Sequence, residues 1–492
     1  MYLCLDSHIR YITLGSDTEK LAEIVAIGLQ KSSTCNLTLE INLPKQTKIG
    51  PPSGSLVAVG GGRLEETGIL SPKQCLTACD ESPSEDVAKF WEDSAPADPT
   101  EMVRFLDPPQ WREAREWGGI DGDLDKALGR TAKRIKETPE LLRLYWHCYW
   151  RLYLAPNPAP PSDWPTFTQM LGDDGGIFYL LVGLAAIPLI RMWHTELGIS
   201  EDITRDTTAQ VHERIHVHQI IHGRPGVEAS QLGWIRHYTR ERYFRIGRLE
   251  YWLAPYKWSE EVFRNKETGE VVAFSGEGVR FSSEGRVFGD PENYTNGEGW
   301  TSTYKRTEAT AEGHLLHPDG HGAHEQVKIS LDDWECLLEE NVMTLELHIP
   351  FGGGMTLDAC RESIEQAKTF FATHFPDEPA VAITCGSWIF SPQLQECLPE
   401  SSNLVVFQRE LFLVPSAAHG ADGLWFVFQK RGLPDFDTWS RKTSVQRAIL
   451  EYLERGHVWG AGRMFFFLDD ASRFGQQTYL SSWPPSTISI TS

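Results

Sequence analysis

The hydrophobic pattern of the chain changes near Arg245, and this change separates two kinds of structure. From Glu85 to Glu241 the apolar residues follow a helical period, which is typical of helices packed on one another. After Arg245, short alternating stretches are interleaved with helical ones, which indicates one mixed sheet covered by helices. We therefore predict an α+β protein in which a helical N-terminal domain precedes a mixed-sheet α/β domain.

The chain of 492 residues is long enough for two or three domains. We predict a poorly defined N-terminal segment over residues 1–84, a helical domain over 85–243 and the α/β domain over 244–480. The stretch 290–322 is polar and rich in Gly, Asn, Thr and His, so we expect an irregular insertion there.

Individual elements of the C-terminal half are predicted from local periodicity. Helices are expected over Leu357–His374, Pro392–Leu398 and Ser444–Arg455. Strands are expected over Gly247–Leu253, Val271–Phe274, Gly278–Phe281, Val342–Ile349, Ala380–Trp388, Asn403–Val414, Leu424–Gln429 and Arg463–Leu468.

Composition excludes some classes of function. The formal net charge is −22, which disfavours nucleic-acid binding because phosphate backbones are repelled. The apolar run Gly175–Ile190 is shorter than the ~20 residues that a membrane span requires, so we expect a core helix and no membrane span. Residues Met1–Ser16 lack the basic and apolar regions of a signal peptide, so we expect a cytoplasmic protein.

A strand–glycine–helix junction within Thr344–Ala367 is the most informative motif. The strand ends at Pro350, three glycines follow at 352–354, and Thr356 is a good N-cap for a helix that begins near Leu357. Glycines let a backbone approach an anion closely, and a helix N-terminus presents free amides, so a pyrophosphate would fit. The alternative is that the glycines form only a tight turn.

Several ordered blocks resemble one family of acyltransferases. The blocks LHIPFGGGMTLDACRESIEQAKTFFATHFPDEP, CGSWIFSPQLQECLPESSNLVVFQREL and TSVQRAILEYLERGHVWGAGR resemble its GNAT-like C-terminal domain. The upstream blocks FLDPPQW and YWHCYWRLY resemble its helical N-terminal domain. The resemblance implies transfer of an acyl group from acyl-CoA, either acetyl-CoA or a longer one, to an unidentified small-molecule or peptide amine.

The resemblance also implies where the co-substrate binds. In GNAT folds a central strand binds the pantetheine arm through its backbone, and the following loop holds the pyrophosphate. The corresponding residues here are Leu347, Ile349, Phe351, Gly352, Gly353, Gly354, Met355 and Thr356. The usual leading Gln or Arg of that loop is absent. A second loop, His457–Gly462, has the order H-x-x-G-x-G, but a strand is expected to follow it.

Acylation of an amine requires a base for the ammonium and a donor for the leaving thiolate. Glu346 and His348 are two residues apart on the predicted strand, so they share a face and are the base candidates. The alternative is that both are ordinary sheet residues. The Tyr that GNAT enzymes often use as the acid is absent from Gln393–Pro399, and the nearest polar groups are Ser387 and Cys385.

Two other functions compete with acyl transfer. One is an inert GNAT-like scaffold, which the missing Gln/Arg and Tyr favour. The other is a zinc hydrolase, because His212, Glu213 and His216 form an HExxH motif and His222 has the spacing of a third ligand. On a continuous helix, however, His222 is turned roughly 600° from His216 and leaves its face. We therefore expect no metal.

Overall fold

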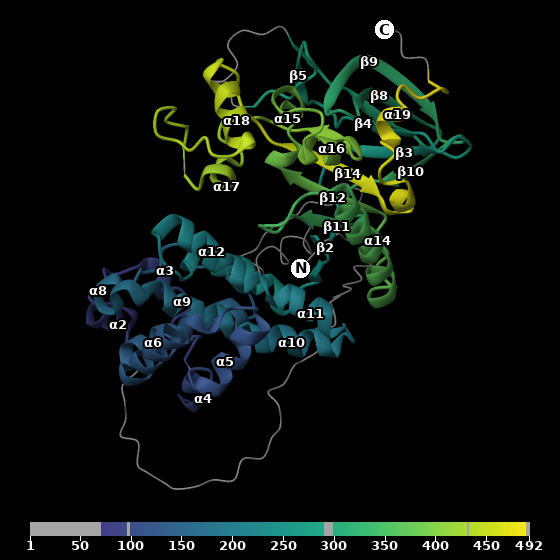
Figure 1. The fold of residues 1–492 in the computed structure, drawn as a ribbon. Helices are drawn as coiled ribbons and strands as arrows, with labels where there is room; N and C mark the ends of the chain where they lie inside the picture. Colours follow the sequence, from purple (N-terminus) through teal and green to yellow (C-terminus); the bar gives the residue numbers. More distant parts are fainter. Residues whose placement is uncertain (1–69, 96–98, 290–298, 431, 489–492) are drawn as a thin grey trace, which may run out of the picture. The chain divides into compact units, whose positions relative to one another are not determined.

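The computed structural model describes residues 70–95, 99–289, 299–430 and 432–488 (Figure 1). Most of the predicted N-terminal segment 1–84 therefore lies outside the described residues. The described part of that segment includes helix α2 (Pro72–Ala78), whose Cys75 and Leu76 are buried in the core of the helical region. The helical region thus extends upstream of Glu85.

The first half of the described chain is helical, as predicted. Its core is formed mainly by α7 (Pro139–Tyr149) and α9 (Gly175–Leu184). Every residue of α9 is buried. The predicted helix over 175–190 is divided into α9 and α10, and Pro188 lies in the first turn of α10, where its missing amide costs nothing. The helices after α2 are α3 (Glu85–Ala88), α4 (Pro99–Arg104), α5 (Pro108–Trp117), α6 (Asp125–Glu137), α7 (Pro139–Tyr149), α8 (Thr168–Leu171), α9 (Gly175–Leu184), α10 (Ile187–Glu196), α11 (Glu201–Thr208), α12 (Gln210–His222) and α13 (Ala229–Ile235).

One helical stretch, Thr168–Glu196, is long and apolar enough to cross a membrane by length and composition alone. Of its most apolar window, 78% is buried inside the protein. A core helix passes the same test, so the stretch is weak evidence for a membrane span.

The second half contains a six-stranded sheet with the order β1-β2-β11-β12-β14-β13. Strands β11 and β12 are parallel, and every other neighbouring pair is antiparallel. Helix α14 connects β11 to β12 and lies against β1 and β2, where Ser363 accepts the Leu249 amide. The elements are β1 (Tyr243–Ile246), β2 (Leu249–Pro255), β11 (Met343–His348), α14 (Leu357–His374), β12 (Ala382–Ser387), β13 (Phe412–Pro415) and β14 (Gly462–Phe467).

The chain between β2 and β11 forms a second sheet with the order β10-β3-β4-β8-β7, and β9 pairs with β8. Its strands enclose a core of their own, in which Phe263, Phe274 and Leu315 are fully buried. The strands are β3 (Glu261–Asn265), β4 (Val271–Phe274), β7 (Tyr304–Arg306), β8 (Thr310–His317), β9 (His321–Ser330) and β10 (Trp334–Leu338), and a separate pair joins β5 (Arg280–Ser282) to β6 (Gly299–Thr301).

This sheet corrects one prediction. The stretch 290–322 was expected to be irregular, but its described part, from residue 299 on, contains β6, β7, β8 and the start of β9. The polar composition concealed β9 in particular, because only its Val327 and Ile329 are buried and most of its other side chains are polar.

Two predicted strands are also wrong. The stretch Asn403–Val414 begins as helix α16 (Asn403–Arg409), and only β13 pairs with β14. The stretch Leu424–Gln429 is helix α17 (Leu424–Phe428), not a strand. Both are short apolar runs, in which a buried helix and a buried strand have the same pattern. Helices α15 (Gln393–Cys397) and α18 (Ser444–Glu454) lie where helices were predicted.

Candidate functional site

Strands β11 and β12 pair over only part of their lengths. Their register runs from Thr344 opposite Ala382 to Glu346 opposite Thr384 and then stops. Beyond that point β11 pairs only with β2, through Leu347 and His348, and β12 pairs only with β14. The two parallel strands therefore separate at their C-terminal ends, and a gap opens in the middle of the sheet.

The backbone of β11 offers hydrogen-bonding groups to this gap. Met343 accepts the Val381 amide through its carbonyl, so the backbone groups of Met343 point toward β12. Because backbone direction alternates along a strand, the groups of Leu347 and Ile349 also point toward β12. The Leu347 amide completes the pairing of Glu346 with Thr384, so the Leu347 carbonyl and the groups of Ile349 remain for an amide-containing arm.

The glycine loop follows β11 directly and is open to solvent. Gly352 and Gly353 have φ values of 76° and 67°, which disfavour other residues. Within the described part of the chain, the amides of residues 352–354 have no hydrogen-bond partner. Thr356 caps α14 as predicted, because its hydroxyl accepts the Ala359 amide at 3.4 Å. Free amides and a helix N-terminus therefore meet at this loop.

A guanidinium that the sequence reasoning missed lies beside the loop. Arg248, in the turn between β1 and β2, donates to the Gly354 carbonyl at 3.1 Å and to the Pro350 carbonyl at 3.2 Å. It thus binds carbonyls at both ends of the loop. The loop lacks the leading Gln or Arg of the GNAT pattern, but the β1–β2 turn brings a cation beside it. No local pattern marks Arg248, which precedes the loop by about a hundred residues.

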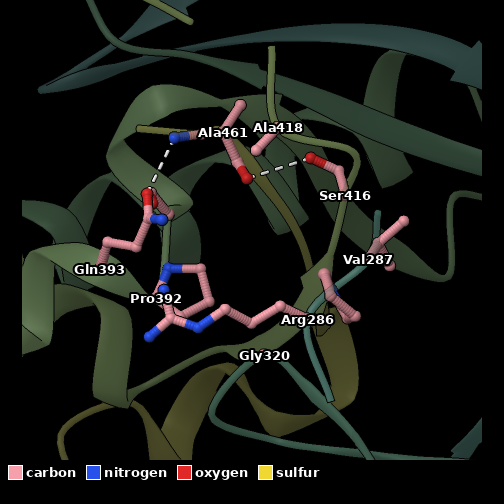
Figure 2. Close-up of a pocket in the computed structure, with 11 residues that line it drawn as sticks. Arg286, Val287, Gly320, Pro392, Gln393, Ser416, Ala418 and Ala461 are labelled. Atoms are coloured by element: carbon pink, nitrogen blue, oxygen red, sulfur yellow. Dashed lines mark hydrogen bonds between the residues drawn. The ribbon is translucent and has the colours of Figure 1, made fainter. Parts of the chain in front are cut away.

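The second candidate loop, His457–Gly462, is packed rather than open. Gln393 accepts the Gly460 amide at 2.8 Å (Figure 2). It also donates to the Val458 carbonyl at 2.6 Å. A strand follows the loop, as predicted, and β14 begins at Gly462, one residue before the predicted Arg463. The loop lines a pocket of about 30 Å³, which has room for about one water molecule. Its Gly460 amide is therefore not available to a phosphate.

Glu346 and His348 lie on the same face of β11, and their side chains approach each other to 3.9 Å. Glu346 is also 3.5 Å from the ammonium of Lys257. The His348 ring lies edge-on to Trp234 and Tyr243, with centroids 4.7 and 5.4 Å away. About a quarter of the His348 side chain is exposed, yet its Nε2 atom is buried and has no hydrogen-bond partner.

The environment keeps His348 neutral. Burial, followed by the charges of His237 and Lys257, lowers the pKa of His348 to about 4. At neutral pH its imidazole is therefore uncharged and has a nitrogen free to accept a proton. A general base must be unprotonated before it acts, but a pKa this far below neutral also makes the imidazole a weak proton acceptor.

Cys385 and Ser387 do not join this pair. Thr384 is in register with Glu346, so the neighbouring side chains of Cys385 and Ser387 point to the opposite face of the sheet. Burial also raises the pKa of the Cys385 thiol far above its usual value. The structure thus brings the two base candidates together and separates them from the predicted acids.

A second carboxyl group lies next to His348 in the sheet. Glu250 of β2 is directly opposite His348, is buried, and accepts hydrogen bonds from Tyr238 at 2.9 Å and from Tyr243. Burial raises the pKa of Glu250 to about 7. Sequence reasoning missed this residue because a Glu in a strand usually faces solvent.

The HExxH residues do not form one ligand set. Glu213 accepts hydrogen bonds from Arg245 at 2.9 Å and from the Phe351 amide at 3.1 Å. His222 pairs with Glu228 at 2.8 Å. His212 and His216 are both exposed on α12. The expected absence of zinc stays a prediction.

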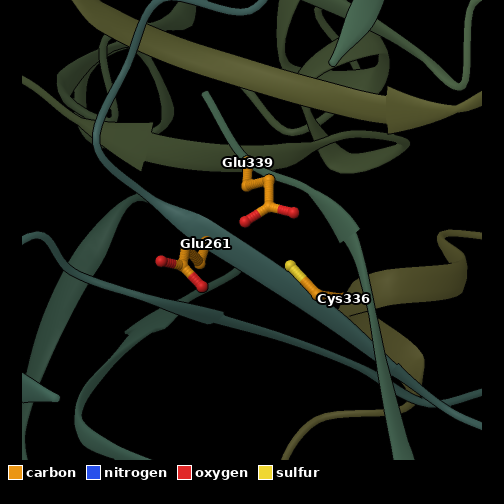
Figure 3. A group of neighbouring side chains, drawn as sticks. All are labelled: Glu261, Cys336 and Glu339. Carbon is orange, nitrogen blue, oxygen red and sulfur yellow. The ribbon is translucent and has the colours of Figure 1, made fainter. Parts of the chain in front are cut away.

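Another group with ligand chemistry lies in the second sheet, where Glu261, Cys336 and Glu339 are neighbours (Figure 3). Arg306 already bridges the two carboxylates, at 2.8 Å from Glu261 and 2.7 Å from Glu339. The guanidinium thus offsets one of the two negative charges without a metal ion.

Comparison with known families agrees with this geometry. Residues 110–240 match a family described as an N-acyltransferase N-terminal domain, and residues 243–466 match a GNAT-like C-terminal domain. The chain belongs to the N-acyltransferases with a GNAT-like C-terminal domain. The predicted fold class and enzyme family are thereby confirmed. No curated protein sequence matches the chain.

Solved structures of acyltransferases share the fold of this N-acyltransferase. One, in complex with decanoyl-CoA and teicoplanin, is 22% identical, with a TM-score of 0.55 over 81% of this chain and 99% of that chain. A second, in complex with CoA and 10C-teicoplanin, is 21% identical, with the same score and coverage. A third, in complex with decanoyl-CoA, is 20% identical, with a TM-score of 0.53 over 80% and 99%.

Proposed function

We propose that this N-acyltransferase moves an acyl group from acyl-CoA to an amine through the gap between β11 and β12. The observation that carries the proposal is the end of strand pairing after Glu346, next to a loop of free amides. The gap leaves backbone groups of Leu347 and Ile349 for the amides of pantetheine. The loop of residues 351–355 and the N-terminus of α14 would hold the pyrophosphate, with Arg248 as a nearby cation.

The base in this proposal is Glu346 or His348. Both lie on the strand that would bind pantetheine, and each is within two residues of Leu347 in the sequence. His348 has a free, buried nitrogen, and Glu346 is next to Lys257. Either group would take a proton from the attacking ammonium, directly or through a water molecule. The acid that protonates the leaving thiolate is not assigned to Cys385, whose side chain is on the opposite face.

The acceptor is proposed only as an amine. One similar structure contains decanoyl-CoA and teicoplanin together, which supports an acceptor site that admits a bulky molecule beside a long acyl donor. Trp234 of α13, beside His348, and the neighbouring His237 come from the helical domain, so both domains would contribute to the acceptor side.

The first test uses donor binding and turnover. Decanoyl-CoA and acetyl-CoA are added separately, and at least one should raise the melting temperature, because a ligand that binds only the native state stabilises it.

Either Glu346→Gln or His348→Ala should lower acyl-CoA turnover by about 10²–10⁴-fold without changing CoA affinity. Slow hydrolysis of the donor can serve as the assay until an acceptor is identified.

A matched control is Glu335→Gln, which alters an exposed carboxylate on β10 of the other sheet. It should leave both donor binding and turnover unchanged. The absence of any thermal shift at about millimolar acyl-CoA would favour an inert scaffold. Full turnover in both strand variants would show that the base lies elsewhere, even if the donor binds.

A further inference from the structure

We propose that Glu213, the acidic residue of the HExxH motif, is a positioning residue that holds the glycine loop in the shape that receives the donor pyrophosphate. The residue belongs to α12 of the helical domain, whereas the loop belongs to the sheet domain. The proposal rests on the acyl-CoA reaction proposed above and adds a role for the helical domain in donor binding.

The contacts of Glu213 fix the first residue of the loop. One carboxylate oxygen accepts the backbone amide of Phe351 at 3.1 Å, and the other accepts from the Arg245 guanidinium at 2.9 Å. Only 16% of the Glu213 side chain is exposed. A carboxylate that is this well covered and bonded at both oxygens is held in one orientation.

Neighbouring contacts strengthen the same connection. The ring of His216, one turn along α12 from Glu213, lies 4.7 Å from the Phe351 ring. The Arg245 amide donates to Thr207 of α11 at 3.2 Å. Helices α11 and α12 thus bind both the start of the sheet and the start of the loop.

The loop is therefore held from two sides. Arg248 binds the carbonyls of Pro350 and Gly354 at its two ends, and Glu213 binds the amide of Phe351. The amides of residues 352–354 are left unbound between these anchors. Preorganised donors of this kind bind an anion more tightly because the loop need not be ordered when the ligand arrives.

The charge of Glu213 does not oppose a phosphate, because Arg245 neutralises it. The contacts give the Glu of the HExxH sequence a role that needs no metal ion, because it binds the start of the loop.

The test compares three substitutions at one position. Glu213→Ala removes both bonds. Glu213→Asp keeps the charge for Arg245 but withdraws it by one methylene from the Phe351 amide. Glu213→Gln keeps an oxygen that accepts that amide. The control is Glu201→Ala, which removes an exposed ion pair with Arg205 on α11.

We expect Glu213→Ala and Glu213→Asp to weaken CoA binding about tenfold or more, as measured by calorimetry with plain CoA. They should raise the KM for decanoyl-CoA while leaving kcat at saturating donor nearly unchanged, because the loop does not touch the reacting atoms. Glu213→Gln should recover most of the affinity, and Glu201→Ala should match the parent. If the alanine variant does not fold, the aspartate variant decides the matter.

Hydrogen exchange of the segment that contains Phe351 gives a readout that needs no ligand. Its protection should fall in the alanine and aspartate variants and not in the control. Unchanged exchange would show that the anchor does not exist, and faster exchange with unchanged CoA affinity would show that it does not position the donor. Either result overturns the proposal. A parent that binds no CoA, yet shows the exchange pattern, would instead refute the proposed function.

Discussion

Glu250 is the residue whose environment departs furthest from what a Glu normally occupies. It is buried between two tyrosines, and burial raises its pKa to about 7 although both hydroxyls donate to it. Arg214 lowers the pKa and Glu213 raises it, but both effects are smaller than that of burial. The native protein therefore binds a proton at Glu250 at pH values where the unfolded chain has released it, since an ordinary Glu titrates near 4.5.

This shift predicts a pH-dependent effect of Glu250→Gln. Because the native pKa is raised, the stability contribution of Glu250 is fully present below about pH 4.5 and is lost as the pH rises through about 7. The glutamine variant lacks that loss. The melting temperature of the variant minus that of the parent should therefore be larger at pH 8 than at pH 5. A difference that is the same at both pH values would mean that Glu250 titrates normally.

For single residues, the sequence predicted the placement of those whose partners are close in the chain. The strand period of two placed Glu346 and His348 on one face, and the helix rule placed the Thr356 cap. It missed Arg248, because its contacts join positions about a hundred residues apart, and Glu250, because a Glu in a strand usually faces solvent. It also could not foresee that strand pairing ends at Glu346, which makes the gap.

The loop between β11 and α14 is the element on which donor binding depends. We expect Gly353→Val to weaken CoA binding, because a branched residue resists a φ of 67° and its side chain would meet Arg248 about 3.5 Å away. Helix α14 should remain folded, since its buried face at Cys360, Ile364 and Ala367 is untouched. The measurements are CoA affinity by calorimetry and the melting temperature.

A control separates backbone strain from the loss of a binding site. Gly269, in the β3–β4 turn of the other sheet, has a φ of 74° and open space around it. Gly269→Val should therefore cost comparable strain but leave CoA affinity intact. If Gly353→Val binds CoA as well as the parent, the pyrophosphate lies elsewhere.

Among the elements, length and amphipathic period decided which predictions held. The long helix Leu357–His374 was predicted with the observed bounds, and β4 was predicted over Val271–Phe274 as found. The prediction failed for the apolar run that became α17, because five consecutive apolar residues carry no period that distinguishes helix from strand. Of the second sheet only β4 was predicted; β7, β8 and β9 were missed because they lie in a stretch with few apolar residues, and β9 buries only Val327 and Ile329.

For the whole molecule, buried histidines set the response to acid. Burial is the main cause that lowers the pKa of His147 to about 3, and of His194 and His348 to about 4. They lie in different parts of the described chain: His147 is bonded to Ser94, His194 to Thr204, and His348 lies beside the gap. Their effects should therefore add, because sites without shared partners are nearly independent.

We expect the free energy of unfolding to fall as the pH drops from about 6.5 to about 4. The unfolded chain protonates its histidines near 6.5, whereas the native protein does not until a lower pH, so acid favours the unfolded state. Each histidine contributes about 1.4 kcal/mol for every pH unit in this window.

Glu250 acts in the opposite direction, so Glu250→Gln should steepen the loss of stability as the pH falls. His194→Asn, which can keep the bond to Thr204, should make the loss shallower. Urea unfolding at several pH values measures both slopes, and a stability that is flat from pH 6.5 to 4.5 in all three proteins would contradict the low histidine pKa values.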